Sequence, residues 1–294
     1  MIGTSSALPR QLRIARPRAV RMAALTALMV SLTGAASAET RLAAHYGIKV
    51  ARITVGKSEM LVTIGDTAFT AAATGQASAI LRILASGEGV LRTTGTVIDG
   101  KLTPATFALT TTSDKDNDAV KMTIDGGNVT ALTAETNTTN EERVPVTDAD
   151  RKGIVDPLTA MLIRVEGTGD VVAADACKRT LPIFDGRRRF DLALSFKRIE
   201  RVKAGKGYAG PAVVCAVAFR PIAGHRRDSA LLDYLTDGRE IELAFAPIAG
   251  TRFLAPFRLS IVSMLGNLVI EATDFTAMAV QAATPAAPTA TVGK

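Results

Sequence analysis

Residues 190–196 read Phe-Asp-Leu-Ala-Leu-Ser-Phe, and this alternation decides the fold class. Side chains two residues apart on a strand point to the same side, so Phe190, Leu192, Leu194 and Phe196 share one apolar face. Three later segments place apolar residues on one face in the same way: Val213, Cys215, Val217 and Phe219; Ile241, Leu243 and Phe245; and Phe253, Phe257, Leu259 and Ile261. The pattern predicts a sheet with one apolar face.

Around this region the chain continues as strand-like segments separated by turn dipeptides. Asp99-Gly100, Asp125-Gly126, Asp185-Gly186 and Asp237-Gly238 indicate turns, because glycine accepts the positive φ that tight hairpins impose. Segments joined by such turns pair antiparallel. The expected strands are residues 45–55, 60–72, 91–98, 102–112, 119–125, 128–136, 187–202, 208–221, 239–247, 252–263 and 267–277.

Helical signals are few and short. We expect helices over Ala77–Ala85, over Ala230–Leu235, and after Asp156-Pro157, where an N-cap carboxylate precedes proline and the pattern continues to Leu162. The capping role accounts for Asp156 better than a catalytic one. Since so little helix cannot cover a sheet of this width, the sheet should curl. The sequence therefore predicts an all-β fold built on one large curled antiparallel sheet, a barrel or half-barrel.

The N-terminal 38 residues have the features of a secretory signal peptide. They hold five arginines and no acid, then an apolar run that starts at Met22, and they close on Ala36-Ser37-Ala38. We expect one domain over residues 39–280 and a disordered tail over 281–294, since no linker divides the rest. No later stretch is long and apolar enough to span a membrane. The expected location is the periplasm, with no transmembrane span after cleavage.

Composition removes several classes of function. The chain has 294 residues, 35 Lys and Arg against 28 Asp and Glu, and a formal charge of +7. Without the five arginines of the leader, 30 basic residues face 28 acidic ones, so a nucleic-acid partner loses its main support. With two His, two Cys and no Trp, the chain offers little for a metal centre or a cofactor, and we expect neither.

Enzyme chemistry also has little support. No G-x-S-x-G or S-x-x-K sequence occurs, and His45 and His225 are the only imidazoles. The sequence does not exclude a glycosidase with a pair of catalytic carboxylates, because such pairs come from distant parts of a chain. We expect no catalytic activity, and a hydrolase is the third choice. The two cysteines, by contrast, predict a disulfide between Cys177 and Cys215 in an oxidising compartment, which stabilises by about 4 kcal/mol in the chain-entropy model.

Several motifs resemble one exported bacterial family, domain of unknown function 3108. They are Arg143-Val-Pro-Val-Thr-Asp148, Val155-Asp-Pro-Leu-Thr-Ala160, Cys177 with Leu181-Pro-Ile-Phe-Asp-Gly-Arg-Arg-Arg-Phe-Asp191, Gly210-Pro-Ala-Val-Val-Cys215, Tyr46, Ala249-Gly-Thr-Arg252 and Pro256-Phe-Arg258. Residues Ile261 to Gly266 depart from the pattern, where a proline-containing turn is expected. The resemblance implies a Gram-negative envelope protein without an assigned activity, similar in outline to periplasmic lipoprotein carriers.

These observations favour a soluble, non-catalytic periplasmic protein that binds a lipid or another apolar ligand, or an apolar segment of an envelope protein. The expected ligand face is the apolar concave side of the sheet: Phe190, Leu192, Leu194, Phe196, Val217, Phe219, Leu243 and Phe245. The alternative is a structural or scaffold protein of the cell envelope with a packed interior. The sequence does not indicate an oligomeric state.

The leader generates a direct prediction. Because cleavage should follow Ala38, the mature protein should begin at Glu39 and be released by osmotic shock. N-terminal sequencing of the released protein checks both points. Membrane-bound protein that still begins at Met1 would contradict the interpretation.

Overall fold

The computed structural model describes residues 38–77, 87–113, 117–135, 142–236, 240–262 and 266–281. All of them belong to one compact unit, Ala36–Lys294. The expected leader before Ala38, the expected tail after Gln281, the helix expected after Ala77 and the expected turn at Asp237-Gly238 lie outside the described residues.

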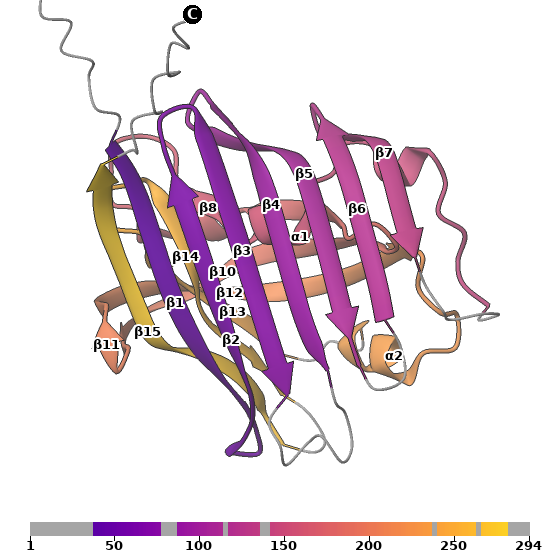
Figure 1. Ribbon diagram of the computed structural model, residues 1–294. Helices are drawn as coiled ribbons and strands as arrows, with labels where there is room; N and C mark the ends of the chain where they lie inside the picture. Colours follow the sequence, from indigo (N-terminus) through magenta and orange to yellow (C-terminus); the bar gives the residue numbers. More distant parts are fainter. Residues whose placement is uncertain are drawn as a thin grey trace, which may run out of the picture. The chain divides into compact units, whose positions relative to one another are not determined.

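The first half of the domain is an antiparallel meander in which each strand pairs with the next. Figure 1 shows these strands side by side in one layer. They are β1 (Ala38–Val50), β2 (Ile53–Ile64), β3 (Ala68–Ala77), β4 (Glu88–Ile98), β5 (Lys101–Thr112), β6 (Asn117–Asp125) and β7 (Asn128–Glu135).

The second half continues the same sheet, because the last strand returns to the first. The strand β15 pairs with β1 along its whole length, and the order runs on from β15 through β14, β13, β12 and β10 to β9. The bounds are β9 (Arg179–Phe184), β10 (Arg189–Lys203), β12 (Ala209–Ala223), β13 (Ile241–Pro247), β14 (Phe253–Ile261) and β15 (Leu268–Gln281); two short strands, β8 (Ile163–Arg164) and β11 (Lys206–Gly207), pair with β14 and β15.

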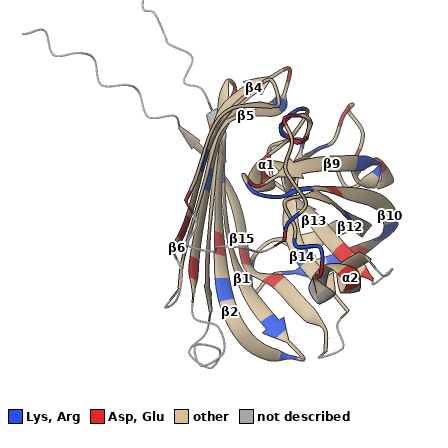
Figure 2. Cartoon of the chain, turned by 90° about the vertical axis from the view of Figure 1, so that its right-hand side faces the viewer, with Lys and Arg blue, Asp and Glu red and all other residues tan. Residues whose placement is uncertain are grey.

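The predicted all-β antiparallel fold is confirmed, and the sheet is open. In the part of the chain that the structure describes, no ladder joins the edge strands β7 and β9. Figure 2 shows two layers, with β10, β12 and β13 in the one that faces the β1–β7 meander. The short helix α1 (Pro157–Ala160) contacts β3, β4, β5 and β9, so it lies where the two layers approach each other.

Around the middle of β12, both faces of the sheet are covered by the chain itself. Ala212 of β12 packs with Leu42 and Val62 of the first layer, whereas its neighbours Val213 and Cys215 pack with residues of the 163–177 segment. All three β12 residues are fully buried. Burial on both faces explains why residues 212–217 are all apolar.

The tip of the β9–β10 hairpin fills part of the gap between the two edges of the sheet. Gly186, at φ 90°, lies so close to β6 that a Cβ there would come within 2.2 Å of the Val120 side chain. Arg187 next to it forms an ion pair with Asp118 of β6, at an N–O distance of 2.8 Å, and donates to the carbonyl of Glu135 in β7. Side-chain contacts therefore join the two edges.

Three expected boundaries were wrong. The predicted strands 45–55 and 60–72 each contain a turn, at Ala51-Arg52 and at residues 65–67. The first was missed because Ala51 and Arg52 adopt positive φ values of 48° and 72° without a glycine, which local rules do not anticipate. The helix at Asp156 stops at Ala160, two residues early. The predicted helix at Ala230 is confirmed as α2 (Ala230–Thr236).

The disulfide between Cys177 and Cys215 is present, with a Cα–Cα distance of 5.4 Å and a sequence separation of 38. Cys177 ends a short 3₁₀ turn, Ala174–Cys177, and Cys215 lies in the middle of β12. Both are fully buried. The bond therefore fastens the segment 163–177 onto one face of the second half of the sheet.

Removing this bond should destabilise the protein. Cys215→Ser should lower the free energy of unfolding by about 2 to 5 kcal/mol, since the loop constraint is lost and a hydroxyl is buried among apolar groups. Urea unfolding measures the change. The Cys177→Ser/Cys215→Ser double variant should lose little more than either single variant, because one bond is lost in each case. Two free thiols in denatured, unreduced wild-type protein would contradict the assignment.

Candidate functional site

The apolar face expected to bind a ligand is largely covered. Its residues do share one face, as the pairings of Leu192 with Phe219 and of Leu194 with Val217 show. Leu194 and Val217, together with Leu243 and Phe245, are buried against the segment 163–177. The expectation of an open concave face is therefore wrong for these four residues.

The remaining four members of that face are reachable from solvent. Phe196 is 43 % exposed, and Phe190, Leu192 and Phe219 are half-buried, with the Phe190 and Phe219 rings 5.5 Å apart. A ligand role for these four residues stays a prediction. Their covered neighbours could not have been identified from the strands alone, since a segment distant in sequence covers them.

A groove that the sequence did not indicate runs along α1 and β8. Its cavity volume is about 260 Å³, and it lies between these elements and the β4–β5 turn. The lining is mostly apolar: Leu102, Val155, Ala160, Leu162, Ile163, Leu181 and Phe253, with Thr159, Lys101, Arg164, Glu166 and Arg179 as the polar members. The arrangement offers an apolar floor with charge at its edge.

Three cations, Lys101, Arg164 and Arg179, border this groove. Arg164 is held by the carbonyl of Asp99 at 2.8 Å and by the carboxylate of Glu166 at 3.1 Å. Arg179 donates to the carbonyl of Arg164 at 3.0 Å, and partial burial lowers its pKa below the usual range for arginine. A guanidinium stays charged at any physiological pH, so the rim carries a net positive charge.

The helix α1 is fixed in the groove wall by a buried carboxylate. Asp156 Oδ1 accepts hydrogen bonds from the amides of Leu158 and Thr159 at 3.0 and 3.1 Å. The hydroxyl of Thr93 in β4 donates to Asp156 Oδ2 at 3.2 Å. Burial raises the pKa of Asp156. The predicted capping role is confirmed, and the contact with Thr93 ties the helix to the first layer of the sheet.

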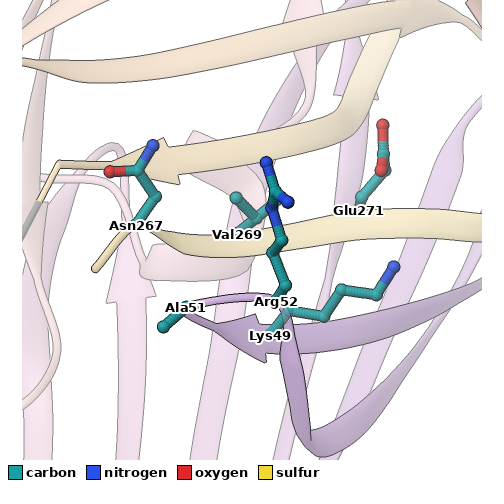
Figure 3. Close-up of a pocket in the computed structure, with 6 residues that line it drawn as sticks. All are labelled: Lys49, Ala51, Arg52, Asn267, Val269 and Glu271. Carbon is teal, nitrogen blue, oxygen red and sulfur yellow. The ribbon is translucent and has the colours of Figure 1, made fainter. Parts of the chain in front are cut away.

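A second cavity, of about 600 Å³, lies beside the β1–β2 turn and the start of β15 (Figure 3). Its lining mixes charged, polar and apolar residues: Lys49, Ala51, Arg52, Asn267, Val269 and Glu271. Glu271 also belongs to a row of ion pairs that runs from β15 to β10.

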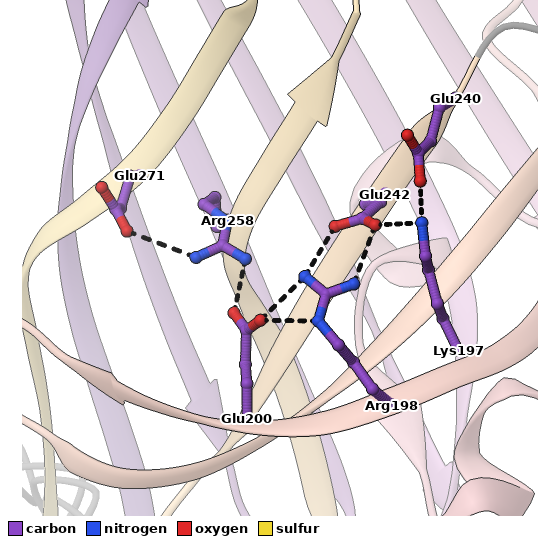
Figure 4. A network of polar contacts seen from close by, with 7 residues as sticks. All are labelled: Lys197, Arg198, Glu200, Glu240, Glu242, Arg258 and Glu271. Atoms are coloured by element: carbon purple, nitrogen blue, oxygen red, sulfur yellow. Dashed lines mark hydrogen bonds and ion pairs between the residues drawn. The ribbon is translucent and has the colours of Figure 1, made fainter.

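This row of charges is the ion-pair network (Figure 4): Lys197, Arg198, Glu200, Glu240, Glu242, Arg258 and Glu271. Arg198 binds Glu242 through two nitrogens, at 2.8 and 2.9 Å, and donates to Glu200 at 3.0 Å. Arg258 links Glu200 to Glu271, with 3.7 Å to the latter. Lys197 contacts Glu242 at 2.6 Å and also Glu240.

The network shifts the ionisation of its central members. Its hydrogen bonds with Arg198 lower the pKa of Glu242 to about 2, despite the opposing effect of burial. The bonds to Glu242 raise the pKa of Arg198 above its usual range. Glu242 is thus held charged, and each cation is already matched to an acid. Such a network favours a stabilising role over proton transfer near neutral pH.

Neither histidine lies in the groove or in the ion-pair network. His45 is near Glu59, at 3.7 Å, with both side chains half exposed. Among the described residues, no group of three or more His, Cys, Asp or Glu residues is arranged to hold a metal ion. No described helix is long and apolar enough to cross a membrane.

Comparisons with known proteins give a family and a fold neighbour. The family model described as "Protein of unknown function (DUF3108)" matches residues 42–273. The chain is also similar to a solved structure from Brucella abortus, described as a beta-barrel-like protein of domain of unknown function DUF1849. The two share 10 % identity with a TM-score of 0.43, over 83 % of this chain and 98 % of that one. No curated protein matches.

The lowered pKa of Glu242 predicts how the network responds to acid. A carboxylate with a depressed folded-state pKa stabilises the protein above its unfolded pKa of about 4.5, and this stabilisation is lost as the pH falls toward about 2. The difference in unfolding free energy between wild type and Glu242→Gln should therefore be largest near pH 7 and shrink over that range. Urea unfolding at a series of pH values measures it.

The control is Glu88→Gln, because Glu88 is an exposed carboxylate on β4 outside the network. Its stability difference from wild type should stay small at every pH. A Glu242→Gln difference that does not change between neutral and acid pH would show that the ion pairs do not hold the charge of Glu242.

Proposed function

This chain belongs to the DUF3108 family, and we propose that it is an exported, non-catalytic envelope protein that binds a lipid or a similar amphipathic molecule. The groove along α1 and β8 is the ligand site in this proposal. The N-terminal leader and the Cys177–Cys215 disulfide support an oxidising compartment such as the periplasm.

The composition of the groove is the observation that carries the proposal. Seven apolar side chains form its floor, and Lys101, Arg164 and Arg179 border it. An amphipathic molecule with an acyl chain and an anionic head group matches both parts, since the chain gains from apolar burial and the head group from charge-assisted hydrogen bonds. Leu102 and Leu181 are half-buried, so part of the apolar floor is within reach of a ligand.

The chemistry of the lining favours binding over catalysis. Its polar members are Lys101, Thr159, Arg164, Glu166 and Arg179. Glu166 is engaged by Arg164 at 3.1 Å, and no imidazole or thiol accompanies the single hydroxyl of Thr159 in the lining. A nucleophile paired with a base, which acyl transfer needs, is not assembled there.

A scaffold protein with a packed interior is the second candidate, and one observation favours it. Three buried apolar clusters occupy the described domain, and they include the central residues of the expected ligand face. In this alternative the groove is a surface depression, and partners would bind the outer faces. The two candidates differ in whether a small molecule copurifies with the protein.

The test combines extraction with a groove variant. Mass spectrometry of organic extracts from protein purified from the periplasm should detect a lipid. Leu102→Glu should weaken binding of the fluorescent fatty acid dansyl-undecanoic acid by about tenfold or more, because it places a charge on the apolar floor. Ile98→Glu is the matched control, since Ile98 is 54 % exposed on β4 and does not line the groove. Equal loss in both variants, or lipid-free protein that does not bind the probe, would favour the scaffold.

A further inference from the structure

The cavity beside the β1–β2 turn, which we call the turn pocket, has an excess of cations, whereas the ion-pair network has more acids than cations. Lys49 and Arg52 supply two cations to its lining, and Glu271 supplies one carboxylate. Both cations are exposed. Figure 3 shows the Arg52 side chain extending from the β1–β2 turn across β15, and the Lys49 side chain extending from the end of β1. The turn pocket therefore carries a net positive charge at neutral pH.

The acid of this pocket is already engaged from the other side. Glu271 lies 3.7 Å from Arg258, which also binds Glu200 (Figure 4). Neither Lys49 nor Arg52 forms an ion pair with any residue that the structure describes. This differs from the three cations of the network, each of which contacts at least one glutamate. The two cations are thus free to bind a ligand.

The backbone of the turn that carries Arg52 is held by contacts with a distant part of the chain. Ala51 and Arg52 both adopt left-handed φ values, which cost free energy in residues other than glycine. The amide of Ala51 donates to the carbonyl of Asn267 at 3.2 Å. Gly266 approaches so closely that a Cβ there would lie 2.6 Å from the Cβ of Ala51. Contacts with the start of β15 therefore fix the turn that presents Arg52.

We propose that the turn pocket binds a phosphate group. A guanidinium fork, an ammonium and the side-chain amide of Asn267 can all donate hydrogen bonds to phosphate oxygens, and a dianion offsets the two unpaired positive charges. A cavity of about 600 Å³ has room for a phosphate ester as well as for the free ion. This site is separate from the groove, and it does not depend on the proposed function.

The phosphate can belong to a soluble molecule or to a lipid head group. Ile53, directly after Arg52, is 59 % exposed, and Val262 at the end of β14 is 38 % exposed. Exposed apolar residues near cations are also found where proteins touch anionic membranes. Both sources present a phosphate group to Lys49 and Arg52. The experiment therefore needs separate arms for a soluble phosphate and for a lipid head group.

The experiment compares two double variants of the full-length mature protein. Lys49→Gln/Arg52→Gln removes both pocket cations, and Arg92→Gln/Lys121→Gln removes two exposed cations on β4 and β6, outside the pocket. Isothermal titration calorimetry with inorganic phosphate at low salt forms one arm. Cosedimentation with phosphatidylcholine vesicles, with and without phosphatidylglycerol, forms the other. Thermal unfolding confirms that both variants are folded.

We expect wild type and the Arg92/Lys121 variant to bind in at least one arm, and the Lys49/Arg52 variant to bind at least about tenfold more weakly there. Binding of phosphate without vesicles indicates a soluble ligand. Binding only to vesicles that contain phosphatidylglycerol, reduced by added phosphate, indicates a lipid head group. No binding in either arm, or equal weakening in both variants, overturns the proposal.

Discussion

The pairing of β1 with β15 is the interaction on which the rest of this structure depends. It joins residues 38–50 to residues 268–281 and so makes one sheet from two halves. Without it, β1 would be an exposed edge of the meander, and β15 would be an exposed edge of the second half. Since this contact spans nearly the whole chain, its loop-closure cost must be met by contacts that the two halves form separately.

The strands were predictable where their signals were local. The chain turns at Asp99-Gly100 and at Asp125-Gly126, as the tolerance of glycine for positive φ predicted. Asp156 caps α1, as the proline that follows it indicated. The Ala51-Arg52 turn was not predictable, because its left-handed backbone is held by Gly266 and Asn267, more than two hundred residues away in sequence. Tertiary contacts of this kind can hold a residue in a backbone conformation that the residue itself does not prefer.

The candidate sites were also predictable only where the signals were local. The shared face of Phe190, Leu192 and Leu194 was correctly derived from strand alternation, but whether it is open depends on where the segment 163–177 lies. Alternation within one strand contains no information about that segment. The groove and the turn pocket also arise between elements far apart in sequence, so their lining residues showed no common pattern. Only the disulfide linked two distant parts of the chain in a way that residue type alone could indicate.

The register of β1 with β15 also has a topological consequence. Ala38 lies opposite Gln281, so the described chain enters and leaves the domain at neighbouring positions on one sheet. A short peptide joining these two positions would leave every strand in place. The protein is therefore suited to circular permutation, with new ends opened at the β6–β7 turn, where Gly126 is exposed. The order in which the strands are synthesised can thus be separated from the order in which they pair.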